Sequence, residues 1–145
     1  DNFDPDNAMV IPTLISRIAN GEDPVVIWGD GTAIRDFAYA ADIADGILLA
    51  LHYGTRGSFV NLGSGQGHSI ADLVEGLHEF LSFNHYFDKT KSAGFPRRVM
   101  DISRARDWIG YEPKTSLRQG LQATYDWFIE NRDEGTRRKN YFCKD

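Results

Sequence analysis

Amphipathic helical segments alternate with short apolar runs along this chain, and each helical segment has its own start and stop residues. Ser69 and Asp72 have the spacing of a capping box, in which side chains satisfy backbone N–H groups in the first helical turn. Similar spacings begin at Ser116 and at Asp42. Apolar residues then recur at helical intervals. The pattern predicts helices over about 12–20, 42–54, 69–81 and from 116 onward, with a shorter one over 103–109.

Four short apolar runs lie between these segments and are bounded by glycine, proline or polar residues. They predict strands over 25–28, 37–39, 59–62 and 84–87. The strands are few and small, so we expect an α/β domain with a small mixed sheet and about four helices, and not a complete doubly wound sheet.

Composition narrows the class of protein. The 145 residues are 41% hydrophobic and 26% charged, which is typical of one soluble globular domain. A net charge of -5 argues against general nucleic-acid binding, and the longest apolar runs are too short to span a membrane. The single cysteine, Cys143, has no internal disulfide partner, which favours a reducing, cytoplasmic setting. We expect a domain over 1–131, a polar tail over 132–145, and, because the chain starts without methionine, a piece of a longer protein.

Motifs for complete catalysis are missing from the sequence. No Gly-x-Gly-x-x-Gly opens a helix after a strand, no Gly-x-Ser-x-Gly occurs, and the four histidines have no metal-ligand spacing. A glycine cluster, 63–67, lies between a predicted strand and a predicted helix. It is suited either to cradling a phosphate or to making a tight turn, and its spacing favours the turn.

Two basic segments are candidates for binding an anion. Arg35 follows the glycine-containing turn after Trp28, where a guanidinium could grip a phosphate or simply pair with a surface acid. The second segment, 89–98, carries Lys91 and Arg97 among turn residues. It is either an anion-binding loop or a solvated basic loop.

Several short motifs occur in a fixed order along the chain. They are Asp1-Asn2-Phe3 with Pro5 and Asn7, Val10-Ile11-Pro12, Trp28-Gly29-x-Gly31-Thr32, Arg35-x-Phe37, Lys91-x-x-Gly94-x-Pro96-Arg97 with Asp101, and finally Leu117, Gly120-Leu121 and Thr124-Tyr125-x-Trp127-Phe128. In order and spacing they resemble the carboxyl-terminal half of extended short-chain dehydrogenase/reductases that act on nucleotide sugars, the GDP-fucose synthases among them. The resemblance extends to about Asn131.

This resemblance implies a substrate-binding half that is not catalytically complete. In the family, an amino-terminal Rossmann half carries the NAD or NADP site and the redox residues. The implied partners are therefore a nucleoside-diphosphate sugar and that missing half, with no cofactor bound by this chain, no nucleic acid and no membrane. Dimers of the family form through the Rossmann half, so that interface is also expected to be absent.

Site residues follow from the resemblance by position. Arg17, Arg35 and Lys91 match residues that contact the diphosphate, and Asn61 and Arg97 match weaker polar contacts. Positions lining the nucleotide and sugar pocket correspond to Val10, Leu14, Ile27 and Trp28. Helical spacing places Val10, Leu14 and Arg17 on one face, although without the resemblance Val10 and Leu14 would be interpreted as core residues.

One position departs from the GDP-fucose synthase pattern. Those enzymes have a histidine, thought to be the epimerisation acid, directly before Val-Ile-Pro, whereas this chain has Met9. A thioether has no proton to donate, so a reductase, a dehydratase or a single-site epimerase fits better than a double epimerase. The alternatives are a stand-alone sugar-nucleotide binding module and a plain protein-interaction domain, both without catalysis.

Overall fold

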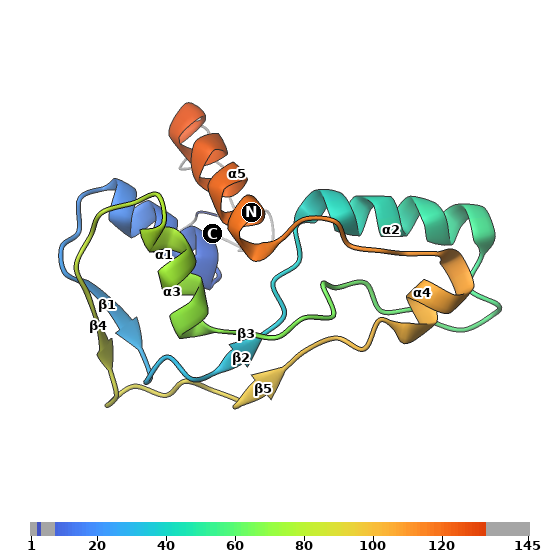
Figure 1. Ribbon diagram of the computed structural model, residues 1–145, viewed down its shortest axis with the longest axis horizontal. Coiled ribbons are helices and arrows are strands. Elements are labelled where there is room, and N and C mark those ends of the chain that lie inside the picture. Colours follow the sequence, from blue (N-terminus) through green and yellow to red (C-terminus); the bar gives the residue numbers. More distant parts are fainter. Residues whose placement is uncertain (1–2, 4–7, 133–145) are drawn as a thin grey trace, which may run out of the picture.

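A computed structural model describes residue 3 and residues 8–132 of the chain (Figure 1). The five helices and five short strands confirm a small mixed α/β domain. In chain order the elements are α1 (Val10–Ala19), β1 (Val25–Trp28), β2 (Ile34–Arg35), α2 (Ala40–Tyr53), β3 (His68–Ser69), α3 (Ile70–His78), β4 (His85–Asp88), β5 (Arg97–Arg98), α4 (Ser103–Ile109) and α5 (Leu117–Glu130).

Two of the three predicted capping boxes are present. Ser69 and Asp72 exchange hydrogen bonds at the start of α3, and Ser116 and Gln119 do the same at the start of α5. Helix α4 ends at Gly110, which has the left-handed conformation common after helix ends. These helix ends were predicted correctly because each depends on residues within one helical turn.

The predicted start of the second helix is wrong. Helix α2 begins at Ala40, with Tyr39 as its N-cap, and the Asp42 side chain does not cap it. Asp42 is instead buried and accepts a hydrogen bond of 2.9 Å from the backbone N–H of Thr115. Its carboxylate therefore ties α2 to the segment that leads into α5.

The strands form two small sheets. Strand β1 has the predicted bounds and pairs in parallel with β4, which is shifted by one residue from the predicted run. In the second sheet, β2 lies between β3 and β5, and each of the three is two residues long. The strand predicted over 37–39 is wrong, because the ladder ends at Arg35 and the chain turns into α2.

The predicted strand over 59–62 is also absent. Its backbone pairs with no strand in the described part of the chain. Side chains hold the segment instead: Asn61 Nδ2 donates to the carbonyl of Asp101 at 3.1 Å, and the Tyr111 hydroxyl donates to the carbonyl of Gly63 at 2.9 Å. An apolar run forms a strand only where a neighbour supplies the hydrogen bonds.

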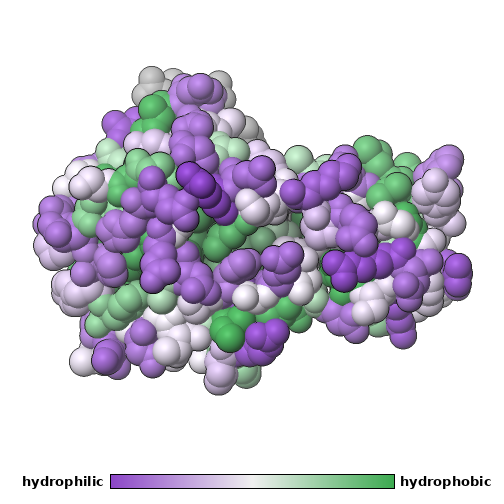
Figure 2. All heavy atoms as spheres, in the orientation of Figure 1, coloured by the Kyte–Doolittle hydropathy of each residue, from purple (hydrophilic) through white to green (hydrophobic). Residues whose placement is uncertain are grey.

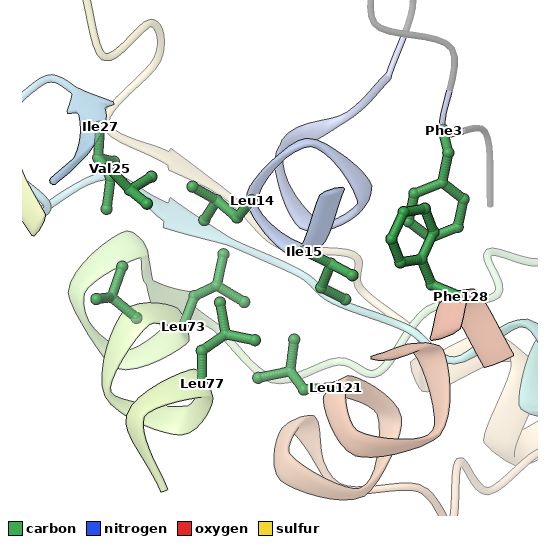
Figure 3. Packing of buried hydrophobic residues seen from close by; sticks show 10 residues of the cluster. Phe3, Leu14, Ile15, Val25, Ile27, Leu73, Leu77, Leu121 and Phe128 are labelled. Atoms are coloured by element: carbon green, nitrogen blue, oxygen red, sulfur yellow. The ribbon is translucent and has the colours of Figure 1, made fainter. Parts of the chain in front are cut away.

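Two hydrophobic cores divide the molecule into two lobes. The main lobe packs α1, α3 and α5 with β1, and Figure 3 shows its buried side chains, including Leu14, Leu73 and Leu121. The small lobe packs α2 against α4 around Ile102, Ala105, Ile109 and Tyr111. Figure 2 shows the narrowing between them. We call this narrow junction between the lobes the waist. The sheet β3-β2-β5 lies there (Figure 1).

Gly46 lets α2 approach the small core closely. A Cβ atom there would lie 2.8 Å from a methyl carbon of Leu62 and 2.9 Å from the ring of Tyr111. Glycine-to-alanine changes inside helices usually stabilise by about 1 kcal/mol. We expect Gly46→Ala instead to lower the free energy of unfolding by about 1–3 kcal/mol through overpacking, as measured by urea denaturation.

Gly120 in α5 is the matched control, because its added Cβ would lie 3.5 Å from the nearest side-chain atom, an ordinary contact. Gly120→Ala should leave stability unchanged or raise it. Equal effects of the two changes would contradict the packing argument.

The remaining expectations concern the chain ends and membranes. Within the described residues, no helix is both long and apolar enough to cross a bilayer. The predicted polar tail lies outside the described residues except for Arg132, and Cys143 lies outside them altogether.

Candidate functional site

A cleft of about 1240 Å³ opens in the main lobe, next to the waist. Its walls come from α1, β1, the segment from β2 into α2, the 92–93 loop and the first half of α5. Six of the nine predicted site residues line it. The six are Val10, Leu14, Arg17, Ile27, Trp28 and Arg35.

The apolar wall of the cleft is also part of the main core. Leu14 and Ile27 are 3% and 4% exposed and belong to the main hydrophobic cluster (Figure 3), and Val10 packs against that cluster. The two interpretations of these residues are therefore compatible, since one layer of side chains faces both the core and the cleft. Trp28, at the end of β1, is 66% exposed, so its indole is open to solvent at the cleft.

Arg17 lies in the last turn of α1 with its guanidinium already engaged. Its Nε donates to Glu22 at 2.7 Å, its Nη2 donates to the other oxygen of the same carboxylate, and its Nη1 donates to the carbonyl of Val26 at 2.7 Å. The hydrogen bond between the two side chains raises the pKa of Arg17 and lowers the pKa of Glu22. Both groups therefore stay charged through the neutral range.

Within the part of the chain that the structure describes, Arg35 forms hydrogen bonds to backbone carbonyls and not to a surface acid. Its Nη1 donates to the carbonyls of Ile34 and Phe95, and its Nη2 donates to the carbonyl of Ala93 at 2.9 Å. The side chain therefore joins β2 to the loop that follows β4. Gly29 allows this loop to lie close, because a Cβ at that position would be 2.7 Å from the Cβ of Ala93.

The other three predicted residues do not line the cleft. Lys91 lies beside it, with its Nζ 5.8 Å from the centre of the Trp28 ring, so the ammonium and the exposed indole are neighbours. Asn61 is engaged with Asp101 near the small lobe. Arg97 is exposed on β5, and its Nη1 lies close to Gly67. Asn61 is thus apart from the other candidates, whereas Arg97 lies on the strand paired with β2, opposite the neighbour of Arg35, without lining the cleft.

Asp36 is a residue of the cleft wall that the sequence did not single out. Its carboxylate accepts hydrogen bonds from the backbone N–H groups of Ser64, Gly65 and Met100 at 2.8, 3.0 and 3.1 Å, and from the Ser64 hydroxyl. It therefore joins β2 to the glycine cluster and to the segment before α4. The one available signal was its place directly after Arg35 in an otherwise apolar stretch.

The same contacts decide between the two interpretations of the glycine cluster. The N–H groups of Ser64 and Gly65 point to Asp36, and the N–H of Gln66 bonds to the Ser64 hydroxyl at 3.1 Å. An internal carboxylate thus takes the place that a phosphate would need. The cluster fits a tight turn and does not fit the pyrophosphate of a dinucleotide.

Several known proteins are similar to this chain in sequence. The family described as NAD dependent epimerase/dehydratase matches residues 1–63. GDP-L-fucose synthase 1 of Arabidopsis thaliana is 40% identical over 90% of this chain, and GDP-L-fucose synthase of Escherichia coli is 32% identical over 92%. The chain spans only 42% and 46% of those two proteins.

A solved structure shares the arrangement of the elements. The UDP-glucuronic acid 4-epimerase Y149F mutant from Bacillus cereus, in complex with UDP-4-deoxy-4-fluoro-glucuronic acid and NAD, matches with a TM-score of 0.75 and 32% identity. The match covers 87% of this chain and 40% of that one.

Proposed function

Because this chain belongs to the NAD dependent epimerase/dehydratase family, we propose that it is the nucleotide-sugar-binding part of an enzyme of that family. The bound NAD or NADP and the redox residues belong, in this proposal, to a part of the protein outside this chain. The chain's 42% share of its Arabidopsis relative supports such a division. On its own, the chain then binds a nucleoside-diphosphate sugar without transforming it.

The observation that carries the proposal is the composition of the cleft. Arg17 and Arg35 lie on its walls, and Lys91 lies against Trp28 at its edge. Guanidinium groups suit the oxygens of a diphosphate, while an exposed indole and an apolar wall suit the flat base or the sugar ring. Most of the anion-binding groups are fixed by hydrogen bonds within the chain, which limits the entropy that ligand binding must remove.

A second surface supports the presence of a covering part. Ile47, Leu48 and Leu51 share one face of α2 by their spacing and are 57%, 63% and 82% exposed, and Phe59 in the segment after α2 is 67% exposed. Large apolar side chains exposed together on one helix face usually mark a contact with another protein segment. We assign it to the missing Rossmann half, and the same surface also favours the second candidate function, a protein-interaction module.

The type of reaction is constrained by Met9. This residue is the N-cap of α1, lines the cleft and is 75% exposed. Its thioether stands where GDP-fucose synthases have a histidine, and it cannot protonate a carbanion. We therefore propose a reductase, a dehydratase or a single-site epimerase, with no epimerisation acid at this position.

Ligand titrations test the proposed function. We expect the complete protein to bind GDP or UDP saturably in calorimetry. The nucleotide that binds with the higher affinity identifies the base. The chain alone should show no saturable micromolar binding of NADPH by fluorescence and no turnover. Tight NADPH binding by the chain alone would overturn the division into two parts. Failure of the complete protein to bind either nucleotide would favour the interaction module.

A further inference from the structure

Glu22 lies in the turn between α1 and β1 and takes no part in the predicted site. Its two carboxylate oxygens accept from Nε and Nη2 of Arg17, which is the side-on edge of the guanidinium. Through Nη1, the same guanidinium reaches the carbonyl of Val26 in β1. The pair therefore joins the end of α1, the following turn and β1.

Glu22 stands behind Arg17 as seen from the cleft. Arg17 and Val26 line the cleft, and Glu22 does not. The Arg17 side chain is 29% exposed and that of Glu22 is 40% exposed, so water reaches the carboxylate from the outer side. A ligand in the cleft would thus meet the guanidinium first.

The hydrogen bonds leave part of the guanidinium for a ligand. An arginine has five N–H donors, and the bonds to Glu22 and Val26 engage one each on Nε, Nη1 and Nη2. Among the contacts of the described residues, one donor remains on each terminal nitrogen. Two such donors suit a bidentate contact with phosphate oxygens.

We propose that Glu22 is a positioning residue, which holds Arg17 so that its remaining donors face the diphosphate of the bound nucleotide sugar. This inference rests on the proposed function and adds to it a residue that does not touch the ligand. Without Glu22, a long arginine side chain has to be ordered when the ligand binds, and that ordering lowers affinity.

Removing Glu22 also has an opposite effect, because it takes a negative charge away from the neighbourhood of an anionic ligand. That charge is paired with Arg17 and open to solvent, so screening weakens its repulsion. The loss of positioning therefore dominates. We expect Glu22→Ala to weaken nucleoside-diphosphate binding about two- to tenfold. Glu22→Gln, which keeps an acceptor oxygen, should weaken it less.

A double-mutant cycle in the complete protein tests this assignment, with GDP and UDP as calorimetric probes. Glu22→Ala should weaken binding when Arg17 is present and should not weaken it in the Arg17→Ala background, where the unpaired carboxylate can only repel the anion. In NMR spectra, the Arg17 Nε–H signal should be protected from exchange in the parent and lose protection in Glu22→Ala. Glu112→Ala is the matched control, because it breaks an Arg–Glu pair of 3.3 Å with Arg106, away from the cleft.

The outcomes separate this inference from the proposed function. If the parent binds nucleoside diphosphate but Glu22→Ala binds equally or more tightly, the positioning role is wrong. An equal loss in the parent and Arg17→Ala backgrounds overturns it as well, since Glu22 would then act without Arg17. If the parent binds neither nucleotide, the proposed function fails and the inference fails with it.

Discussion

Asp36→Ala is expected to lower the free energy of unfolding by about 2–3 kcal/mol, because three backbone N–H groups lose the charged acceptor that they share, and one of the three belongs to the buried Ser64. The groups belong to Ser64, Gly65 and Met100. The change therefore releases both the glycine cluster and the segment before α4 from the end of β2. Urea denaturation measures the loss. Asp36→Asn keeps a single acceptor oxygen and should fall between the parent and the alanine variant.

Asp30→Ala is the matched control for Asp36. The Asp30 carboxylate accepts from the N–H and hydroxyl of Thr32 in its own exposed turn, at 3.0 and 2.6 Å. Its loss should cost clearly less than that of Asp36, because water can satisfy exposed groups. If Asp36→Ala were no less stable than Asp30→Ala, the waist would not depend on the Asp36 carboxylate.

Arg35→Ala is expected to weaken nucleotide-sugar binding by the complete protein ten- to a hundredfold, which corresponds to about 1.5–3 kcal/mol for a charge-assisted contact. The structure adds a second reason, since Arg35 also holds the loop at Ala93 and Phe95 that precedes β5 and follows Lys91. Arg35→Lys should not restore binding, because an ammonium lacks the planar fork. Calorimetry on each variant, with thermal melting as the folding control, measures the effect.

Two comparison variants sharpen this test. Lys91→Ala should lose less affinity than Arg35→Ala, because an ammonium makes a less directional contact. Arg104→Ala removes an arginine that stacks on Phe59 and Trp108 in the small lobe, and it should leave binding unchanged. A folded Arg35→Ala variant with parental affinity would show that Arg35 is no part of the site.

The features predicted correctly from the sequence are local ones. The capping boxes of α3 and α5, the stop at Gly110 and strand β1 each depend on residues a few positions apart. The family resemblance then pointed to six residues of the cleft wall, among them Val10 and Leu14, which the sequence pattern alone did not distinguish from core residues.

The features that were missed depend on contacts between distant parts of the chain. Arg35 and Phe95 are 60 positions apart, and Asp36 and Met100 are 64 apart. Nothing in the local sequence tells whether a guanidinium bonds to a carboxylate, a carbonyl or a ligand. The run 59–62 failed for a related reason, because its apolar pattern predicts an extended segment but not the neighbour that a strand requires.

Because the waist is narrow, the two lobes can differ in their local stability against unfolding. Each lobe has its own core, and the sheet between them contains only strands of two residues. Few backbone hydrogen bonds therefore resist a sub-global opening in which the small lobe loosens while the main lobe stays folded. The carboxylates of Asp36 and Asp42, which bond across this junction, carry much of the cooperativity between the lobes. Because Asp36 and the start of α2 also border the cleft, a bound ligand would favour the closed junction and make the two lobes unfold as one unit.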